Sequence, residues 1–360
     1  MNTIKIAMLL ALAALFLCPA CQVSPSDDDD DPTPPTPNLD SYEDGIFISH
    51  QGNPALNINS SVSFRDRATS GVVDSIYQQA NSGAVLPPIH SMQLHDGRIY
   101  LISNSENQVV VVAANSFQRI GTINNLQKPR YLLPIGNNKA CISEWGEDGI
   151  SGRLSIVDLN SLQISNSIPT RPGPEQMLLD GNHLYVVNNG GFALDSVVSK
   201  VSLTTEEVLE TIKVGLAPNS LQIDQNGHLW VLCQGIKDPF VPSNNRNGEL
   251  VRLENDELQF RLELAPAANN LVISPDGSRL YFVNQEWLYA HGLGDTSLSL
   301  TPFIASPFSH IAVHPNTGDL YCVDPRNLQS DGSVLVFSGV GALQYTFQTS
   351  VAPNGFGFME

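Results

Sequence analysis

At residues 184–188 the chain reads Leu184-Tyr185-Val186-Val187-Asn188, an apolar run that ends in a polar residue. Runs of the same kind recur with a period of roughly 45 residues, a spacing typical of repeat architectures. The other six runs occupy residues 46–49, 99–104, 140–144, 229–233, 280–284 and 320–324. Short runs of β-branched and aromatic residues that are nearly unbroken in apolar character predict strands buried on both faces.

A second element, a proline followed by an apolar strand, occurs at Pro88, Pro129, Pro174, Pro218, Pro266, Pro307 and Pro353. Turns such as Asp96-Gly97 and Asn226-Gly227 connect it to the apolar runs, and such pairs are strong hairpin signals. Further strands, such as residues 154–159 and 163–168, follow each run. Four strands repeated seven times predict an all-β fold, a seven-bladed β-propeller with four-stranded blades.

The two repeated elements are out of phase at the ends of the chain. The first apolar run, at Ile46, is the second strand of a blade, and the last strand, from Pro353, is a first strand. We therefore expect the C-terminal strand to complete the N-terminal blade, which leaves no open edge. The alternative is an open β-solenoid, whose repeats are shorter and lack such complementary ends.

The N-terminal residues predict an exported, lipid-anchored protein. Residues 1–21 read as a lipoprotein signal peptide with an imperfect lipobox, in which Cys21 follows Ala20 and is the residue that we expect to be lipidated. The alternative is an ordinary signal peptide cut near Ala20. Residues 22–44 hold five consecutive aspartates and a proline-rich stretch, which predicts a solvated tether. The propeller domain is then expected over residues 45–360.

The composition excludes several kinds of partner. There are 36 acidic and 18 basic residues, giving a formal charge of −18, so neither nucleic acid nor an anionic membrane surface is an expected partner. Membrane contact is expected through the lipid anchor only. After processing at Cys21, the remaining Cys141, Cys233 and Cys322 lie in apolar runs without metal-site spacing, so we expect buried free thiols.

The repeat core, including Leu184–Asn188 and Val214-Gly215-Leu216-Ala217-Pro218, resembles YVTN/YncE-like propellers over residues 45–360. Four blocks, at residues 118–123, 128–131, 174–177 and 229–235, resemble surface propeller lipoproteins of Bacteroidetes (DUF5074-like), some of which bind corrinoids. The resemblance implies a lipid-anchored protein on the outer-membrane surface that captures a corrinoid-like or other nutrient for a TonB-dependent transporter. The acidic tether resembles the export signal of such proteins, with a plain acidic linker as the alternative. A periplasm-facing lipoprotein or a secreted protein is the alternative location.

Propeller geometry predicts where a ligand would bind. The first and second strands of a blade are antiparallel, so residues beside each proline and residues that end each apolar run share one face, which we call the rim face. These residues combine amides, histidines and aromatic rings, a mixture that suits a neutral ligand with many acceptors. The candidate ligand-binding residues are His50, His90, Arg130, Tyr131, Glu144, Trp145, Glu175, Asn188, Asn189, Asn219, Gln234, Asn269, Trp287, His310, Asp324 and Arg326. The long loops 234–248 and 52–61 start at this face and are also candidates.

Enzyme motifs are weak in this sequence. It has no GxSxG motif, no phosphate-binding glycine loop and no CxxCH motif, so we expect a binding protein without a cofactor, a metal or a catalytic residue. Two other functions stay open. One is a lactonase-type hydrolase that uses the rim carboxylates Glu144, Glu175 and Asp324, and the other is a protein-interaction scaffold at the cell surface.

Overall fold

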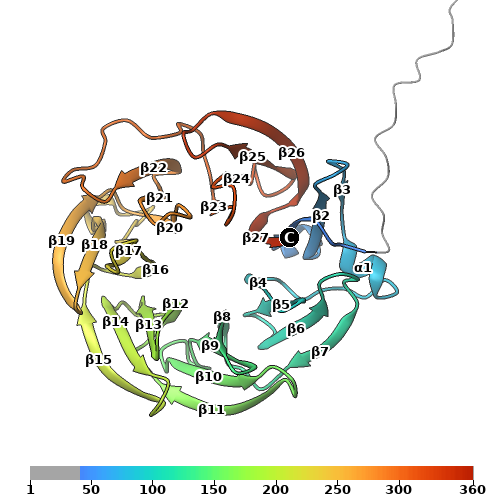
Figure 1. Cartoon of the computed structure of the whole chain (residues 1–360), viewed down its shortest axis with the longest axis horizontal. Helices are drawn as coiled ribbons and strands as arrows, with labels where there is room; N and C mark the ends of the chain where they lie inside the picture. The colour runs from blue at the N-terminus through green and yellow to red at the C-terminus, as the bar shows by residue number, and fades with distance from the viewer. Residues whose placement is uncertain (1–40, 360) are drawn as a thin grey trace, which may run out of the picture. The chain divides into compact units, whose positions relative to one another are not determined.

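The computed structural model describes residues 41–359, and these form a ring of seven antiparallel sheets (Figure 1). Cys21, the signal peptide and residues 22–40 of the expected tether lie outside the described residues. Blade 1 combines the last strand, β27 (Pro353–Met359), with β1 (Gly45–His50), β2 (Ser61–Asp66) and β3 (Val72–Val73).

The other blades follow in chain order, and within each blade the chain runs from the inner strand to the outer strand. Blade 2 is β4 (Ser91–His95), β5 (Arg98–Ser103), β6 (Gln108–Ala113) and β7 (Arg119–Ile123). Blade 3 is β8 (Pro129–Gly136), β9 (Lys139–Glu144), β10 (Arg153–Asp158) and β11 (Gln163–Pro169). Blade 4 is β12 (Pro174–Asp180), β13 (His183–Asn188), β14 (Val197–Ser202) and β15 (Glu207–Lys213).

Blade 5 is β16 (Pro218–Ile223), β17 (Leu229–Cys233), β18 (Gly248–Glu254) and β19 (Glu257–Leu264). Blade 6 is β20 (Asn269–Ile273), β21 (Arg279–Asn284) and β22 (Trp287–Gly292), and an isolated bridge from Leu288 to Ile304 lies outside its named strands. Blade 7 is β23 (His310–Val313), β24 (Leu320–Asp324), β25 (Asp331–Phe337) and β26 (Leu343–Val351). The seven-bladed propeller is thus confirmed, with one blade reduced to three named strands.

The few helices lie between strands. They are η1 (Pro54–Leu56), α1 (Ile76–Ala80) and η2 (Pro242–Asn244). Among residues 41–359, none of the helices has the length and apolar character needed to cross a bilayer.

The seven apolar runs form the second strand of each blade, as predicted. In β13, for example, every residue from Leu184 to Asn188 is buried. These strands pair with an inner and a third strand, and the adjacent blades cover both of their faces, which explains why they lack polar alternation. Cys141, Cys233 and Cys322 are free and buried within them, and burial raises the pKa of each thiol.

Strand β27 closes the ring, as the phase of the repeats predicted. It pairs antiparallel with β1, with Phe358 opposite Ile46 and Phe356 opposite Ile48. The first and last strands of the domain therefore pair with each other in one sheet, and neither is left without a partner strand (Figure 1).

The chain enters the propeller at the face opposite the rim face. Tyr42 donates its backbone N–H to the carbonyl of Asn115 at 2.7 Å, and the N–H of Arg67 donates to the carbonyl of Asp44 at 3.2 Å. Asn115 lies in the turn between β6 and β7, and Arg67 follows the end of β2. Both positions are on the face where inner strands end, so the rim face is on the other side of the ring.

Candidate functional site

A repeated backbone hydrogen bond closes the rim in four blades. In blades 1, 3, 4 and 5, a proline opens the inner strand, and the residue before it has a positive φ: Ala352 (56°), Lys128 (51°), Gly173 (65°) and Ala217 (52°). The carbonyl of each accepts the N–H of the residue after the second strand, at 2.9–3.2 Å. This contact holds the start of each rim loop over its own inner strand. The prolines 88, 266 and 307 lie three residues before β4, β20 and β23 instead.

Blade 6 departs from this arrangement. Its second and third strands are joined by the two-residue turn Gln285-Glu286, with φ of 51° and 72°, whereas blade 5 uses residues 234–247 for the same connection. The rim loop of blade 6 is therefore much shorter than the rim loop of the neighbouring blade 5. Non-glycine residues with positive φ gather here, since Ala267 (74°) and Arg326 (53°) join the two turn residues. Such strained backbone tends to concentrate at functional sites.

A pocket of about 410 Å³ lies beside this short loop, between blades 6 and 7, and we call it the interblade pocket. Its volume falls in the range that is usual for small-molecule sites, about 300–1,000 Å³. It is lined by Lys237, Ala267, Asn269, Val283, Gln285, Glu286, Pro307, Phe308, Ser309, Asp324, Pro325 and Arg326. Three predicted ligand-binding residues, Asn269, Asp324 and Arg326, are thus brought together.

The interblade pocket combines apolar surface with charges of both signs. Val283 and Phe308 are buried in its wall. Arg326 pairs with the Asp324 carboxylate at 3.4 Å and donates to the Ser333 hydroxyl at 2.9 Å, so its guanidinium is held in place. Within residues 41–359, the side chains of Lys237 and Glu286 have no ion-pair partner, so both are available to a ligand.

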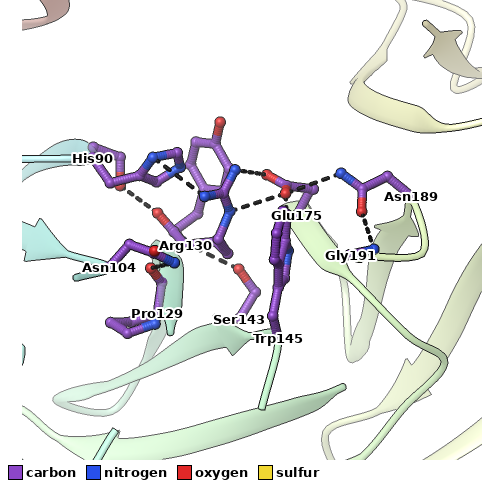
Figure 2. A network of polar contacts seen from close by, with 11 residues as sticks. His90, Asn104, Pro129, Arg130, Ser143, Trp145, Glu175, Asn189 and Gly191 are labelled. Carbon is purple, nitrogen blue, oxygen red and sulfur yellow. Dashed lines mark hydrogen bonds and ion pairs between the residues drawn. The ribbon is translucent and has the colours of Figure 1, made fainter. Parts of the chain in front are cut away.

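A second group of predicted residues forms one network on blades 2, 3 and 4, which we call the Arg130–Glu175 cluster (Figure 2). The Glu175 carboxylate accepts from Arg130 Nε at 2.9 Å, Trp145 Nε1 at 3.0 Å and Asn189 Nδ2 at 3.1 Å. Burial raises the pKa of Glu175, against the opposing effect of Arg130. Burial and the nearby Arg130 lower the pKa of His90 to about 3, so its Nδ1 accepts from Arg130 Nη1 at 3.5 Å.

The aromatic rings of the cluster pack against it. The Arg130 guanidinium lies 4.2 Å from the ring centre of Trp145, and the Phe192 ring meets Trp145 edge-on at 5.7 Å. Tyr131 meets His90 edge-on at 5.4 Å, and burial raises the pKa of Tyr131. Trp145 and Arg130 are therefore largely occupied by each other, and Tyr131 packs on His90. Phe192, at 70% exposure, is the ring of this group that projects into solvent.

Three of the predicted ligand-binding residues are fully buried inside the blades. His50 hydrogen-bonds Thr349 Oγ1 at 2.7 Å, and burial lowers its pKa to about 4. Glu144 pairs with Arg153 at 2.8 Å and accepts from Ser155. Asn188 donates to the Arg171 carbonyl at 2.9 Å. Each of them is the last residue of a second strand, and none presents surface to a ligand.

Several rim amides hold neighbouring blades together. Asn354 donates to the Ile89 carbonyl at 2.9 Å, and Asn219 donates to the Ala268 carbonyl at 2.8 Å. The amide of Asn270 donates to the Ser309 carbonyl at 3.1 Å. The amide density of the rim, which suggested a ligand, thus has a structural role at these positions.

The remaining predicted residues lie outside both groups. Gln234 and Trp287 are exposed, Trp287 by 43%, and His310 is half-buried with its pKa lowered to about 4 by burial. Sequence reasoning missed Lys237, Glu286 and Phe308 in the interblade pocket. The loop containing Lys237 was singled out by its length, but the unusually short turn at Glu286 gave no signal. Among residues 41–359, no group of three His, Cys, Asp or Glu side chains could hold a metal ion.

The chain belongs to a family described as "Domain of unknown function (DUF5074)", whose model matches residues 44–322. This confirms the DUF5074-like resemblance. A search of curated proteins found no match.

Many solved structures share the fold. A quinonprotein alcohol dehydrogenase-like protein from Bacteroides thetaiotaomicron has a TM-score of 0.67 and 16% identity, over 89% of this chain and 79% of that one. A functionally unknown protein from Desulfotomaculum acetoxidans has a TM-score of 0.63 and 10% identity, over 88% and 98%. Apo AztD from Citrobacter koseri has a TM-score of 0.52 and 13% identity, over 87% and 96%. At such identities the likeness establishes the propeller fold alone.

Proposed function

We propose that this protein binds a small organic ligand at its rim face, with the interblade pocket as the principal contact. The observation that carries the proposal is the pocket itself, which combines apolar walls, a fixed guanidinium, two side-chain amides and two charged side chains with no ion-pair partner among residues 41–359. Pockets of this volume with a few convergent polar groups are the usual form of small-molecule sites.

The ligand class that we favour is a corrinoid-like nutrient, because four sequence blocks resemble surface propeller lipoproteins, some of which bind corrinoids. A corrinoid carries amide side chains and a phosphate around one large ring system. The amides could meet Asn269 and Gln285, and the phosphate could meet Lys237. A ligand of that size would extend beyond the pocket over the inner strands of the ring.

The geometry of chain entry supports a surface-anchored role. Residues 42–44 join the propeller at the face opposite the rim face. A tether that ends at residues 42–44 would therefore attach to the propeller on the face away from the ligand site and would not cover the rim face. We propose an outer-membrane lipoprotein on the cell surface that delivers its ligand to a TonB-dependent transporter. A periplasm-facing or secreted protein is the alternative.

A lactonase-type hydrolase is the second candidate, and the state of the carboxylates makes us favour binding over catalysis. Glu144 is fully buried and ion-paired, and Glu175 already accepts four hydrogen bonds, from Arg130, Trp145 and Asn189. Asp324 is the carboxylate of the three that lines the interblade pocket, and it is engaged by Arg326. General acid–base catalysis needs a carboxylate within hydrogen-bond reach of the substrate.

Calorimetric titration with cobalamin and haem tests the proposal. We expect one of them to bind, and we expect Arg326→Ala or Gln285→Ala to weaken its binding about tenfold, or by about 1.4 kcal/mol. Gln118→Ala is the matched control, because this exposed amide lies in a turn on the opposite face. Failure of every probe to bind would reject the ligand class. Binding that both pocket variants leave intact would reject the site, and turnover of a lactone probe would favour the hydrolase.

A further inference from the structure

A second pocket, of about 260 Å³, lies on the rim face between blades 1 and 2, away from the interblade pocket. We call it the amide pocket. It is lined by Gln51, Pro54, Asn57, Ile58, Asn59, Ser60, Leu86 and Pro88. Most of these residues belong to the loop between β1 and β2, and the others belong to the segment that leads into β4.

The loop that forms this pocket is held by its own hydrogen bonds. Asn53 and Ile58 exchange two backbone hydrogen bonds, at 2.8 and 3.0 Å. Ser60 Oγ donates to the Gln51 carbonyl at 2.6 Å and accepts the N–H of Ile89 at 3.2 Å, so it ties the loop to the next blade. A Cβ at Gly52 would lie 2.5 Å from the Ile58 carbonyl oxygen, so the loop closes tightly on itself. The pocket is therefore preformed rather than shaped by a ligand.

The amide pocket is lined by uncharged side chains. Its lining contains no charged residue, in contrast to the interblade pocket, which has four. The side-chain amides of Gln51, Asn57 and Asn59 make no hydrogen bond to any residue of 41–359, and each offers both a donor and an acceptor. Pro54, Ile58, Leu86 and Pro88 supply apolar surface beside them.

We infer that the amide pocket binds a neutral, hydroxyl-rich ring, that is, one monosaccharide unit of a glycan. Each sugar hydroxyl is both a donor and an acceptor, as a carboxamide is, and the C–H face of a sugar ring can pack on proline and isoleucine. A charged ligand would leave an ion partly desolvated without a counter-charge, which is costly. The pocket volume limits the bound unit to about a single ring.

Saturation-transfer NMR on the purified protein tests this inference with glucose, galactose, mannose and N-acetylglucosamine, and with glucuronate and glucosamine as charged comparators. We expect at least one neutral sugar to bind with a dissociation constant in the millimolar range, and the charged comparators to bind more weakly. The double variant Gln51→Ala/Asn59→Ala should weaken sugar binding about tenfold. Both side chains are exposed, so the fold should be kept.

The controls separate this site from the interblade pocket. Gln118→Ala on the opposite face and Arg326→Ala in the interblade pocket should leave sugar binding unchanged. The inference is overturned if none of the four neutral sugars binds, or if binding survives the double variant or depends on Arg326. Equal or tighter binding of a charged comparator through the same amides would overturn the ligand class. None of these outcomes depends on whether cobalamin or haem binds at the interblade pocket.

Discussion

Single residues on the rim face show how a polar side chain can serve the fold and not a ligand. Arg130, Glu175 and Trp145 were predicted as separate contacts, yet they form one cluster with Asn189. The sequence shows that each is polar or aromatic and close to a strand end. It does not show which side chains of neighbouring blades meet, because that depends on the spacing of blades around the ring.

Replacing Glu175 by Gln should change the pH dependence of stability. Because burial raises the pKa of Glu175, the folded protein binds a proton more readily than the unfolded chain, and this carboxyl destabilises the fold as pH rises through its folded pKa. We expect the wild type to lose more stability than Glu175→Gln between pH 4.5 and pH 8, by about 1.4 kcal/mol for each pKa unit of the shift. Urea unfolding at several pH values measures the difference, and parallel curves would contradict it.

His50 should act in the opposite direction. Burial lowers its pKa from 6.5 to about 4, so its neutral form is favoured in the fold. Stability is then lost as pH falls from about 6.5 towards 4, because the unfolded chain takes up the proton first. We expect this one group to cost up to about 3 kcal/mol at pH 4, and His50→Gln to remove that part of the acid sensitivity. An unchanged acid limb in the unfolding curves of His50→Gln would show that folding does not lower the pKa of His50.

At the scale of strands and loops, the sequence was most informative where burial is most complete. All seven apolar runs became second strands, because residues enclosed on both faces must be apolar whatever lies nearby. Four strands were predicted for blade 6, which has three named strands, and α1 was not predicted. Outer strands are half-exposed and their composition is weakly constrained, so their presence is harder to predict.

The lengths of two rim loops explain the interblade pocket. The interblade pocket exists because the turn at Gln285 and Glu286 is short while the loop 234–247 is long. Loop length can be counted from the sequence once strand ends are known. The difference in loop length creates a pocket only where two blades meet. The position of that meeting could not be predicted from the sequence.

Closure by β27 can be tested on one side chain. Phe356 pairs opposite Ile48, meets Tyr321 edge-on at 5.8 Å and stacks on Phe358 at 6.2 Å. We expect Phe356→Ala to destabilise the domain by about 2–3 kcal/mol, below the value for a fully buried Phe because this ring is half-buried. Deletion of residues 352–360 should abolish cooperative unfolding. Leu343→Ala, at an exposed position of β26, is the control and should change stability by less than about 0.5 kcal/mol.

For the whole molecule, the central prediction is that Cys21 carries the lipid. We expect labelled palmitate to be incorporated into the wild type and not into Cys21→Ala, and the variant to be released as a soluble protein. Equal labelling of the two proteins would contradict the anchor. If the protein is displayed on the cell surface, ligands added outside intact cells should reach the rim face, whereas they should not reach a periplasm-facing protein.

The pairing of β27 with β1 also means that the order of blades along the chain is arbitrary. Met359 lies directly opposite Gly45 in the sheet, on the face where turns such as Asp180-Gly181 connect inner to second strands elsewhere. A short turn joining these two positions would make blade 1 like its neighbours, and new termini could then be opened between any two blades. Circularly permuted versions of this domain should therefore fold, and a fusion partner could be attached at whichever blade suits the experiment.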